Sequence, residues 1–444
     1  MKGSQGIGLV PCLAFAVGTM VGGGVFTLSG TALNEAGPAA LVSYLVAGTV
    51  MLLSALSFVA ISSRAGPGES GYGPVGDLLS PLWRYVVMWG FYLNGLTIIA
   101  FLLVSFGEYL RHYFLPNLGV TVAALLAGVL ITWLNLGPAD LVARTETLVV
   151  ALKIALLLVF VAWGVASFTS IRFTPFAPHG TGGVLSASAL LFTAYTGFNV
   201  VTNMASSVRN PRRTVPIAVM GSVLFSAALY IGVVLAMLAS DIRTFGAAGV
   251  GQAAEALMGA WGGYMIAFAA CLSTLSGANA NMLGASEIML RMVARGDVPP
   301  IAGRATRRGH PLISVLFIGA VTVVLILTSD ITTIVGLANV GALVSMVVVN
   351  MAAGVLALRG WPGEGTQLPG GVAIPVIGTL SCLAQFPSLG WRPVALGLLM
   401  VAAGLLVFRL MHRLPQEERD AERARAALHH LETPLLRALR GPSD

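Results

Sequence analysis

The sequence predicts an all-α membrane protein with twelve transmembrane helices, and this prediction rests on its composition and its apolar windows. Of the 444 residues, 56% are hydrophobic and only 10% are charged, and the mean hydropathy is +0.86. A soluble domain carries about 25% charged residues. About 20 apolar residues cross a bilayer as one helix. Windows of this kind cover residues 8–31, 38–62, 83–110, 119–136, 142–168, 185–205, 215–239, 262–292, 311–328, 331–357, 372–388 and 392–411.

The first apolar stretch, from Ile7, is interpreted as a membrane span and not as a signal peptide, because no small-residue cleavage site follows it. Cys12, Cys271 and Cys382 show neither a disulfide framework nor the spacing of a metal site. The six histidines all lie in loops or in the tail. We therefore expect no metal and no cofactor, and no histidine in any proton pathway through the membrane.

The basic residues predict the orientation. With the N-terminus inside, only four arginines fall outside: Arg111, Arg172, Arg243 and Arg392. The cytoplasmic segments hold the rest: Lys2, Arg64, Arg84, Arg144, Arg209, Arg212, Arg213, Arg291, Arg295, Arg304, Arg307, Arg308, Arg359 and every arginine from Arg409 on. This is the bias of the positive-inside rule. It places both termini in the cytoplasm and the protein in the inner (plasma) membrane, and it explains the net charge of +7 without a nucleic-acid partner.

Lys153 stands in the middle of the apolar run 148–163, and Lys2 is the only other lysine. A charged side chain at that depth costs several kcal/mol unless it is paired or faces a polar cavity. Snorkelling to an interface is the alternative, but roughly ten or more helical residues lie on each side, which is beyond the reach of a lysine. We therefore expect a functional role for Lys153.

Two predicted spans carry interruptions, at Gly18–Phe26 and at Thr193–Asn199. Three consecutive glycines, Gly22 to Gly24, weaken a helix and leave its N–H groups open to a ligand. No strand precedes them and no Lys-Ser/Thr follows, so a phosphate-binding loop is excluded. Close helix packing through small residues is the alternative for a single break. Breaks in the first helix of each of two five-helix sets predict instead a transporter site near the bilayer midplane.

Several short motifs resemble those of the amino acid–polyamine–organocation transporters. They are Gly18-x-Met20-Val21-Gly22-x-Gly24-Val25-Phe26; Phe192-x-Ala194-Tyr195-x-Gly197-Phe198 with Asn210-Pro211-x-Arg213-x-x-Pro216; Leu283-Gly284-Ala285-Ser286 with Ala294-Arg295-x-x-x-Pro299; and Pro67-Gly68-Glu69-Ser70-Gly71-Tyr72. Two positions depart from the family: Ser206-Ser207 replace its usual acidic residues, and Ser70-Gly71 replace its Gly-Gly. These departures concern a cytoplasmic gate and not the central site.

The resemblance implies a LeuT-like fold, in which two five-helix repeats are inverted relative to each other. The first repeat would cover residues 1–170 and the second residues 185–358. Two additional peripheral helices would occupy residues 372–411. The tail, residues 415–444, has charges of both signs at helical spacing and is interpreted as a solvated cytoplasmic helix; a regulatory role is the alternative.

The two breaks match a zwitterionic amino acid, because opened helix halves offer N–H donors at one end and carbonyl acceptors at the other. We expect the substrate carboxylate at Gly22, Gly23 and Gly24. A leucine at Gly23 should then fill the space that the carboxylate needs and leave folding intact. The ammonium should meet carbonyls of both breaks, near Gly18, Thr19, Phe192, Ala194, Tyr195 and Gly197. No Asp or Glu lies in mid-span, which favours neutral substrates over dibasic ones or polyamines.

The resemblance also implies that Lys153 occupies the place of a sodium ion in sodium-coupled relatives, with Ser273, Thr274 or Ser276 of the eighth span as hydroxyl partners. Desolvation disfavours the charged form of a buried amine, so Lys153 is predicted to carry the coupled proton.

The predicted function is secondary active, sodium-independent, proton-coupled amino acid transport by alternating access. One alternative is an exchanger of amino acids or amines in which Lys153 stays charged. A membrane sensor of the same fold that does not transport is the other. An enzyme is excluded, because the sequence shows no nucleophile–base pair, metal cluster or intact phosphate loop.

Overall fold

The computed structural model of the chain describes residues 8–66, 71–136, 140–167, 173–198, 208–305, 311–361, 365–368 and 370–413. Within these ranges the chain is helical and contains no β-strand. The predicted tail at residues 415–444, the loop motif around Glu69 and the Ser206-Ser207 pair lie outside the described residues.

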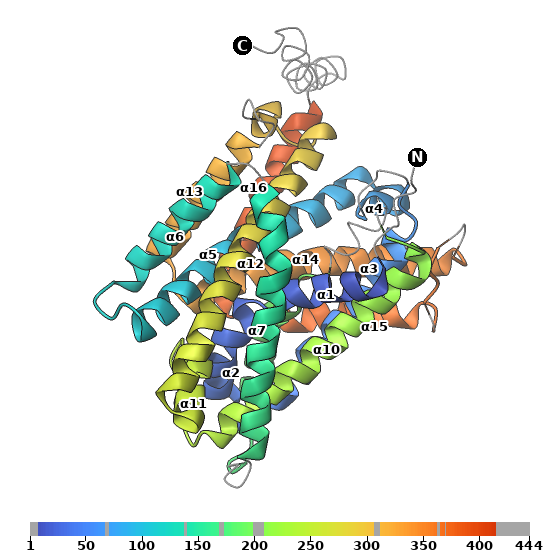
Figure 1. Cartoon of the computed structure of the whole chain (residues 1–444). Coiled ribbons are helices and arrows are strands. Elements are labelled where there is room, and N and C mark those ends of the chain that lie inside the picture. The colour runs from blue at the N-terminus through green and yellow to red at the C-terminus, as the bar shows by residue number, and fades with distance from the viewer. Residues whose placement is uncertain are drawn as a thin grey trace, which may run out of the picture.

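The helices are numbered as in Figure 1. Those of the first part of the chain are α1 (Leu9–Met20), η1 (Gly24–Leu28), α2 (Ser29–Ala36), η2 (Gly37–Ala39), α3 (Ala40–Ser62), α4 (Gly73–Leu78), α5 (Pro81–Tyr113), α6 (Val120–Asn135) and α7 (Asp140–Ala166). Those of the second part are α8 (Gly180–Leu191), η4 (Phe192–Tyr195), α10 (Pro211–Ala239), α11 (Gly249–Met258), α12 (Ala260–Ala294), η6 (Pro300–Gly303), α13 (Leu312–Thr328), α14 (Ile331–Leu358), α15 (Ala373–Gln385), η7 (Phe386–Leu389) and α16 (Trp391–Arg413).

Eleven of the twelve predicted apolar windows overlap one of these helices or a consecutive group of them over most of their length. The window 185–205 overlaps α8 and η4 only as far as Tyr195, and its residues 199–205 lie outside the described ranges. Within the described residues, seven helical stretches are long and apolar enough to cross a membrane, by length and composition, and four shorter apolar helices accompany them. Two described helices, α4 and α11, were not predicted from the sequence. Helix α11 is amphipathic: Val250, Ala253 and Ala254 are buried, whereas Glu255 is exposed.

Helix ends follow the local sequence. Pro81 and Pro211 stand at the first turns of α5 and α10, where the missing N–H has no intrahelical acceptor to lose. Asp330 caps α14, because its carboxylate accepts a hydrogen bond from the Thr333 N–H at 3.1 Å. Beyond the end of α12, Gly296 takes the left-handed conformation that terminates many helices.

The long helices sort into two packed groups. Helix α5 lies along α12 and α14, with α6 and α13 beside them, and we call these five the α5 group. Helices α1, α3, α8 and α10, with α2 at the end of α1, form the α3 group. Helix α7 packs against both α10 and α12 (Figure 1). The two interrupted spans, α1–η1–α2 and α8–η4, belong to the α3 group, so the breaks face the α5 group.

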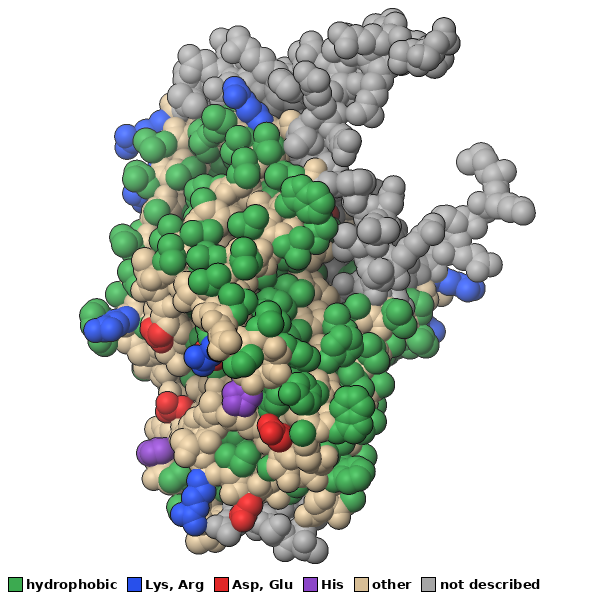
Figure 2. All heavy atoms as spheres, turned by 60° about the vertical axis from the view of Figure 1, so that its left-hand side comes forward, with side chains coloured by type: hydrophobic (Ala, Val, Ile, Leu, Met, Phe, Trp, Pro, Cys, Tyr) green, Lys and Arg blue, Asp and Glu red, His purple; other side chains and the backbone are tan. Residues whose placement is uncertain are grey.

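The surface between the two ends of the molecule is largely apolar. Figure 2 shows one such face, on which hydrophobic side chains are numerous and charged ones are few. Large apolar side chains with high exposure include Leu126, Trp133, Leu148 and Leu399. A surface of this kind is suited to lipid, because acyl chains are as apolar as these side chains.

Helices α4 and α11 mark opposite ends of the molecule (Figure 1). The described arginines concentrate at the α4 end, where α3, α12, α14 and α16 finish and where α5 and α10 begin: Arg64, Arg84, Arg209, Arg213, Arg291, Arg295, Arg304, Arg359, Arg409 and Arg413. At the α11 end are Arg111, Arg243 and Arg392.

A buried carboxylate joins α16 to the α5 group at the α4 end. Asp297, just beyond α12, is 1% exposed. One of its oxygens lies 4.0 Å from Nη2 of Arg84 on α5, and the other lies 3.7 Å from Nε2 of His412 on α16. The other C-terminal helix, α15, packs against α14 and α3.

Candidate functional site

The first helix breaks where the sequence predicted it. Helix α1 ends at Met20, and a π-helical turn begins at Gly24. Between them the Gly22 N–H donates to the Met20 carbonyl at 2.7 Å. This bond joins residues two apart, as in a γ-turn, whereas an α-helix joins residues four apart. The amides of Gly23 and Gly24 open the new helix, so they belong to the N–H groups that a helix start leaves without intrahelical acceptors.

The three glycines of this break have different surroundings. A Cβ on Gly24 would lie 2.9 Å from the Cβ of Ala194, and one on Gly23 would lie 2.6 Å from Cδ2 of Leu102. A Cβ on Gly22 would meet nothing nearer than 3.8 Å, and Gly22 alone of the three is partly exposed. The sequence placed the substrate space at Gly23. In this structure Leu102 of α5 lies against that position, and the open position of the three is Gly22.

The second break is also present. Helix α8 ends at Leu191, a 3₁₀ turn covers Phe192–Tyr195, and Thr196 is extended. The Thr193 carbonyl accepts from both the N–H and the hydroxyl of Thr196, at 3.1 and 2.7 Å. Gly197 has φ +133°, a conformation that only glycine adopts readily. The predicted end of this break, Asn199, lies outside the described residues.

The two breaks touch each other. The Thr19 hydroxyl lies 3.2 Å from the Gly197 carbonyl and also within reach of the Ala16 carbonyl, at 2.9 Å. Gly24 faces Ala194 so closely that neither break could carry a larger residue at this point. The segments brought together here are about 180 residues apart in the chain.

Tyr230 of α10 joins both breaks, and the sequence analysis did not find it. Its hydroxyl lies 2.8 Å from the Met20 carbonyl and 2.9 Å from the Ala194 carbonyl, and its side chain is fully buried. Both carbonyls stand at interrupted helix ends, where the regular α-helical pattern of hydrogen bonds stops. The only sequence signal was a hydroxyl in the middle of an apolar window, where it requires a partner.

Lys153 reaches the first break from α7. Its side chain is 1% exposed, and Nζ donates to the Gly18 carbonyl at 2.7 Å. Gly18 makes this approach possible, because a Cβ there would lie 2.6 Å from Cγ2 of Val150, one turn before Lys153 on the same helix. A glycine on α1 thus brings α7 close enough for the ammonium to bond a backbone oxygen of the interrupted helix.

The hydroxyls predicted as partners of Lys153 are in different places. Ser273 of α12 donates to the Val21 carbonyl at 3.0 Å, so it meets the same break from the opposite helix. The Thr274 hydroxyl bonds its own helix, at the carbonyls of Ala270 (2.8 Å) and Cys271 (3.1 Å). Ser276 lies further along α12 and is partly exposed. Ser273 therefore bonds the first break directly, from α12.

The two aromatic residues predicted near the substrate are fully buried. The Tyr195 hydroxyl donates to the Tyr44 carbonyl on α3 at 3.0 Å, and its ring packs edge-on against Tyr230 with centroids 5.3 Å apart. Tyr195 therefore packs inside the α3 group. Phe192 is 0% exposed at the start of the 3₁₀ turn.

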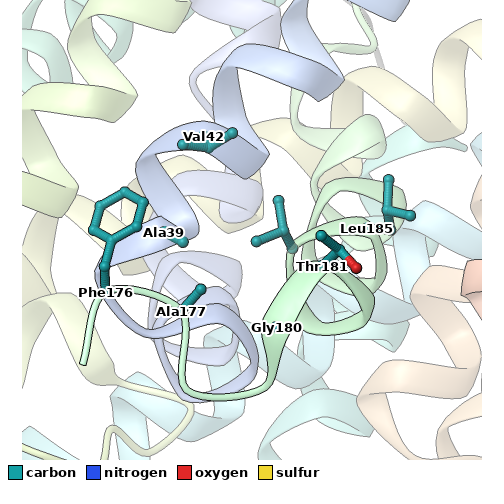
Figure 3. A pocket seen from close by; sticks show the side chains of 8 residues that line it. Ala39, Val42, Phe176, Ala177, Gly180, Thr181 and Leu185 are labelled. Atoms are coloured by element: carbon teal, nitrogen blue, oxygen red, sulfur yellow. The ribbon is translucent and has the colours of Figure 1, made fainter. Parts of the chain in front are cut away.

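Exposure at the breaks is one-sided. Residues on their α11 side, such as Val25, Phe26 and Phe192, are 0% exposed. Thr19, Gly22, Gly197 and Ser276, at the breaks or on their α4 side, are partly exposed. Among the described residues, those on the α11 side of the breaks are thus the more deeply buried ones. A separate apolar hollow between the start of α3, Phe176 and α8 (Figure 3) lies away from both breaks.

The acidic side chains placed by the structure near span ends have other roles. Glu108 pairs with Arg111 at 3.4 Å, Asp330 caps α14, and Glu287 is exposed. Asp297 faces Arg84 and His412 at the α4 end. The polar groups described at the breaks are backbone groups, hydroxyls and the ammonium of Lys153, which reaches the first break from α7.

The fold and the site define a multi-pass helical membrane protein built around two interrupted helices that meet. Residues 7–404 match the family described as Amino acid permease, and the chain belongs to this family. It is a family of transporters, and the protein is not an enzyme.

Similar proteins carry transporter names. The branched-chain amino acid permease BcaP of Bacillus subtilis (strain 168) is 26% identical over 436 residues, which cover 92% of this chain and 93% of that protein. The methylthioribose transporter of the same strain is 23% identical over 89% of this chain and 91% of its own length. The chloroplastic cationic amino acid transporter 9 of Arabidopsis thaliana is 30% identical, but over only 52% of this chain and 44% of its own.

The first prediction concerns Tyr230. Tyr230→Phe removes the buried hydroxyl that lies within hydrogen-bonding distance of carbonyls of both breaks, so we expect a loss of about 1–3 kcal/mol in stability and faster hydrogen–deuterium exchange over residues 18–26. Thermal unfolding and exchange mass spectrometry of the purified protein measure the two effects. Tyr85→Phe is the control, because the Tyr85 hydroxyl also bonds a buried carbonyl, that of Gly404 at 2.9 Å, far from the breaks. Equal exchange at residues 18–26 in both variants would show that Tyr230 does not hold the break.

Proposed function

We propose that the protein is a sodium-independent, proton-coupled transporter of neutral amino acids that works by alternating access. In this proposal twelve helices span the inner membrane as two inverted five-helix repeats with two further helices, and the α4 end is cytoplasmic. The concentration of arginines at that end supports the orientation. Two interrupted helices that begin corresponding halves of the chain support the repeat.

The substrate site of the proposal lies between the two breaks. The carboxylate would bind the amides that open the π-turn, with Gly22 as the open side of this cradle. The carbonyls that would receive the ammonium are fewer than the sequence indicated, because protein donors already bond those of Gly18 and Ala194. The proposal therefore places the ammonium at the Thr19 carbonyl. Substrate and Lys153 therefore use neighbouring acceptors of one broken helix.

Neutral substrates are supported by the absence of Asp and Glu from the residues of both interrupted spans, 8–31 and 185–205. A second positive charge on the substrate would need a buried counter-charge. The full-length match to a protein named a branched-chain amino acid permease agrees with this choice. The cationic amino acid transporter matches only about half of the chain.

The hydrogen bond between Lys153 and Gly18 is the observation on which the coupling proposal rests. A charged ammonium bonds a carbonyl roughly twice as strongly as a neutral amine does. A proton taken up from outside would thus tighten the tie between α7 and the first half of the broken helix. Release of the same proton to the cytoplasm would loosen it. Substrate bound next to this tie would move with the same conformational change.

The substrate cradle is tested at Gly22. We expect Gly22→Leu to fold, because a Cβ there meets only backbone atoms at 3.8 Å or more, and to lose amino acid binding. Thermal shift of the purified protein against a panel of neutral amino acids measures this: a ligand at about 100 times its Kd stabilises the wild type by about 2.7 kcal/mol. Ala14→Leu, an exposed position on α1, is the control. Wild-type affinity in Gly22→Leu would contradict the cradle.

The coupling is tested at Lys153 with proteoliposomes. Lys153→Ala should lose accumulation driven by a pH gradient but keep exchange, since the backbone groups of the site remain. Lys153→Arg should lose it as well, because a guanidinium does not release its proton in proteins.

The exchanger with a permanently charged Lys153 is the alternative, because the same hydrogen bond fits a fixed cation. In that case Lys153→Arg would partly replace the wild type, and transport would respond little to pH. Accumulation at wild-type rates in Lys153→Arg would exclude Lys153 as the proton carrier.

A further inference from the structure

Two amide side chains hold the end of α8 on its α11 side. Asn339 of α14 donates through Nδ2 to the carbonyls of Ala189 and Leu190, at 2.7 and 3.2 Å. Gln385, the last residue of α15, donates through Nε2 to the Ser188 hydroxyl at 3.0 Å. Three consecutive residues of α8 are thus bonded by two other helices. We call Asn339 and Gln385 the amide clamp.

The clamp exists because α8 breaks. A helix leaves its last four carbonyls without intrahelical donors, and α8 ends at Leu191. Ala189 and Leu190 are therefore carbonyls that need a donor from elsewhere, and both are buried with Asn339, which is 0% exposed. Since a carbonyl can only accept, the side-chain nitrogen of Asn339 must be the atom that faces it.

The Asn339 part of the clamp crosses between the two helix groups. Asn339 belongs to the α5 group through α14, and α8 belongs to the α3 group. A second hydrogen bond crosses at the α11 end, from the Tyr109 hydroxyl of α5 to the Phe26 carbonyl at 2.6 Å. All of these bonds lie on the side where the residues at the breaks are more deeply buried. A path to the breaks from the α11 end requires the two groups to separate there, and α8 cannot leave α14 while the clamp is formed.

The two amides of the clamp form hydrogen bonds through their nitrogens but not through their oxygens in the described structure. The oxygens Oδ1 of Asn339 and Oε1 of Gln385 are buried without a hydrogen bond from the part of the chain that the structure describes. A buried acceptor that lacks a donor costs free energy. Closure therefore gains the bonds to α8 but leaves two oxygens unsatisfied, as suits a contact that must open and close during each cycle.

We propose that Asn339, assisted by Gln385, is the positioning residue that sets how often the transporter opens at its α11 end. The proposal rests on the proposed function, in which that end faces outward and opens once per cycle. The clamp is formed in the state open toward α4 and broken in the state open toward α11. Weakening it should raise the population of the second state.

A distance measurement between the two groups tests this. Spin labels at Thr181→Cys on α8 and His112→Cys on α5, both exposed positions near the α11 end, report the separation by pulsed electron resonance. Cys271, the half-buried native cysteine, is replaced by alanine in all samples. Asn339→Leu keeps the size of the side chain and removes its donor. We expect the ratio of the population at the longer distance to the population at the shorter distance to rise about fivefold. This is the effect of losing one hydrogen bond of ordinary net strength.

Asn94→Leu is the matched control. Asn94 is also buried, and its amide donates to the Ala338 carbonyl at 2.9 Å, one residue from Asn339, but this bond stays within the α5 group. Both variants should lower the thermal midpoint, and only Asn339→Leu should lengthen the distance. Gln385→Leu should lengthen it to a smaller extent and serves as the second variant if Asn339→Leu does not fold.

An unchanged distance distribution in Asn339→Leu and Gln385→Leu, or an equal change in Asn94→Leu, would overturn the proposal. The measurement needs no substrate, so its result is independent of transport. A lengthened distance in a protein that moves no amino acid would leave the clamp in place and refute the proposed function. Normal amino acid uptake with an unchanged distance would leave the proposed function in place and refute the clamp.

Discussion

The hydrogen bond from Lys153 to the Gly18 carbonyl is the interaction on which the account of this protein depends. An ammonium that is 1% exposed in an apolar helix must be compensated, and the acceptor is a backbone oxygen at the end of a helix that has been cut short. The glycine run cuts the helix, and Gly18 admits α7 to its side. The broken helix and the buried amine therefore explain each other: neither is stable at this depth without a polar partner.

The same requirement organises the surrounding side chains. Each interrupted helix end exposes carbonyls, and donors from several helices meet them: Ser273 from α12, Tyr230 from α10 and Asn339 from α14. The bonds of Ser273 and Asn339 connect the α5 group to the α3 group, whereas those of Tyr230 join the two breaks within the α3 group. A change in any one donor alters the balance between groups, so binding at the breaks and movement of the helices act on the same set of bonds. This is the physical basis on which substrate and proton would be coupled.

Much of this arrangement follows from the sequence, and some of it does not. The apolar windows, both breaks and the importance of Lys153 are local signals: run length, consecutive glycines and a charge in an apolar segment. The contacts of Tyr230 with Met20 and Ala194 join residues up to 210 positions apart, and no local pattern predicts them. For the same reason the sequence indicated Gly23 as the open glycine, whereas Leu102 from α5 fills that space and Gly22 is open. Helix α11 was missed because its ten residues are too short and too polar for an apolar window.

The most direct test of the central claim is uptake of a radiolabelled neutral amino acid by proteoliposomes that contain the purified wild-type protein, with an imposed pH gradient and with choline in place of sodium. We expect accumulation above equilibrium when the outside is acidic, collapse of that accumulation with a proton ionophore, and no effect when sodium is restored. An absolute requirement for sodium would contradict the central claim, because the amine of Lys153 would then not occupy the place of the coupling ion.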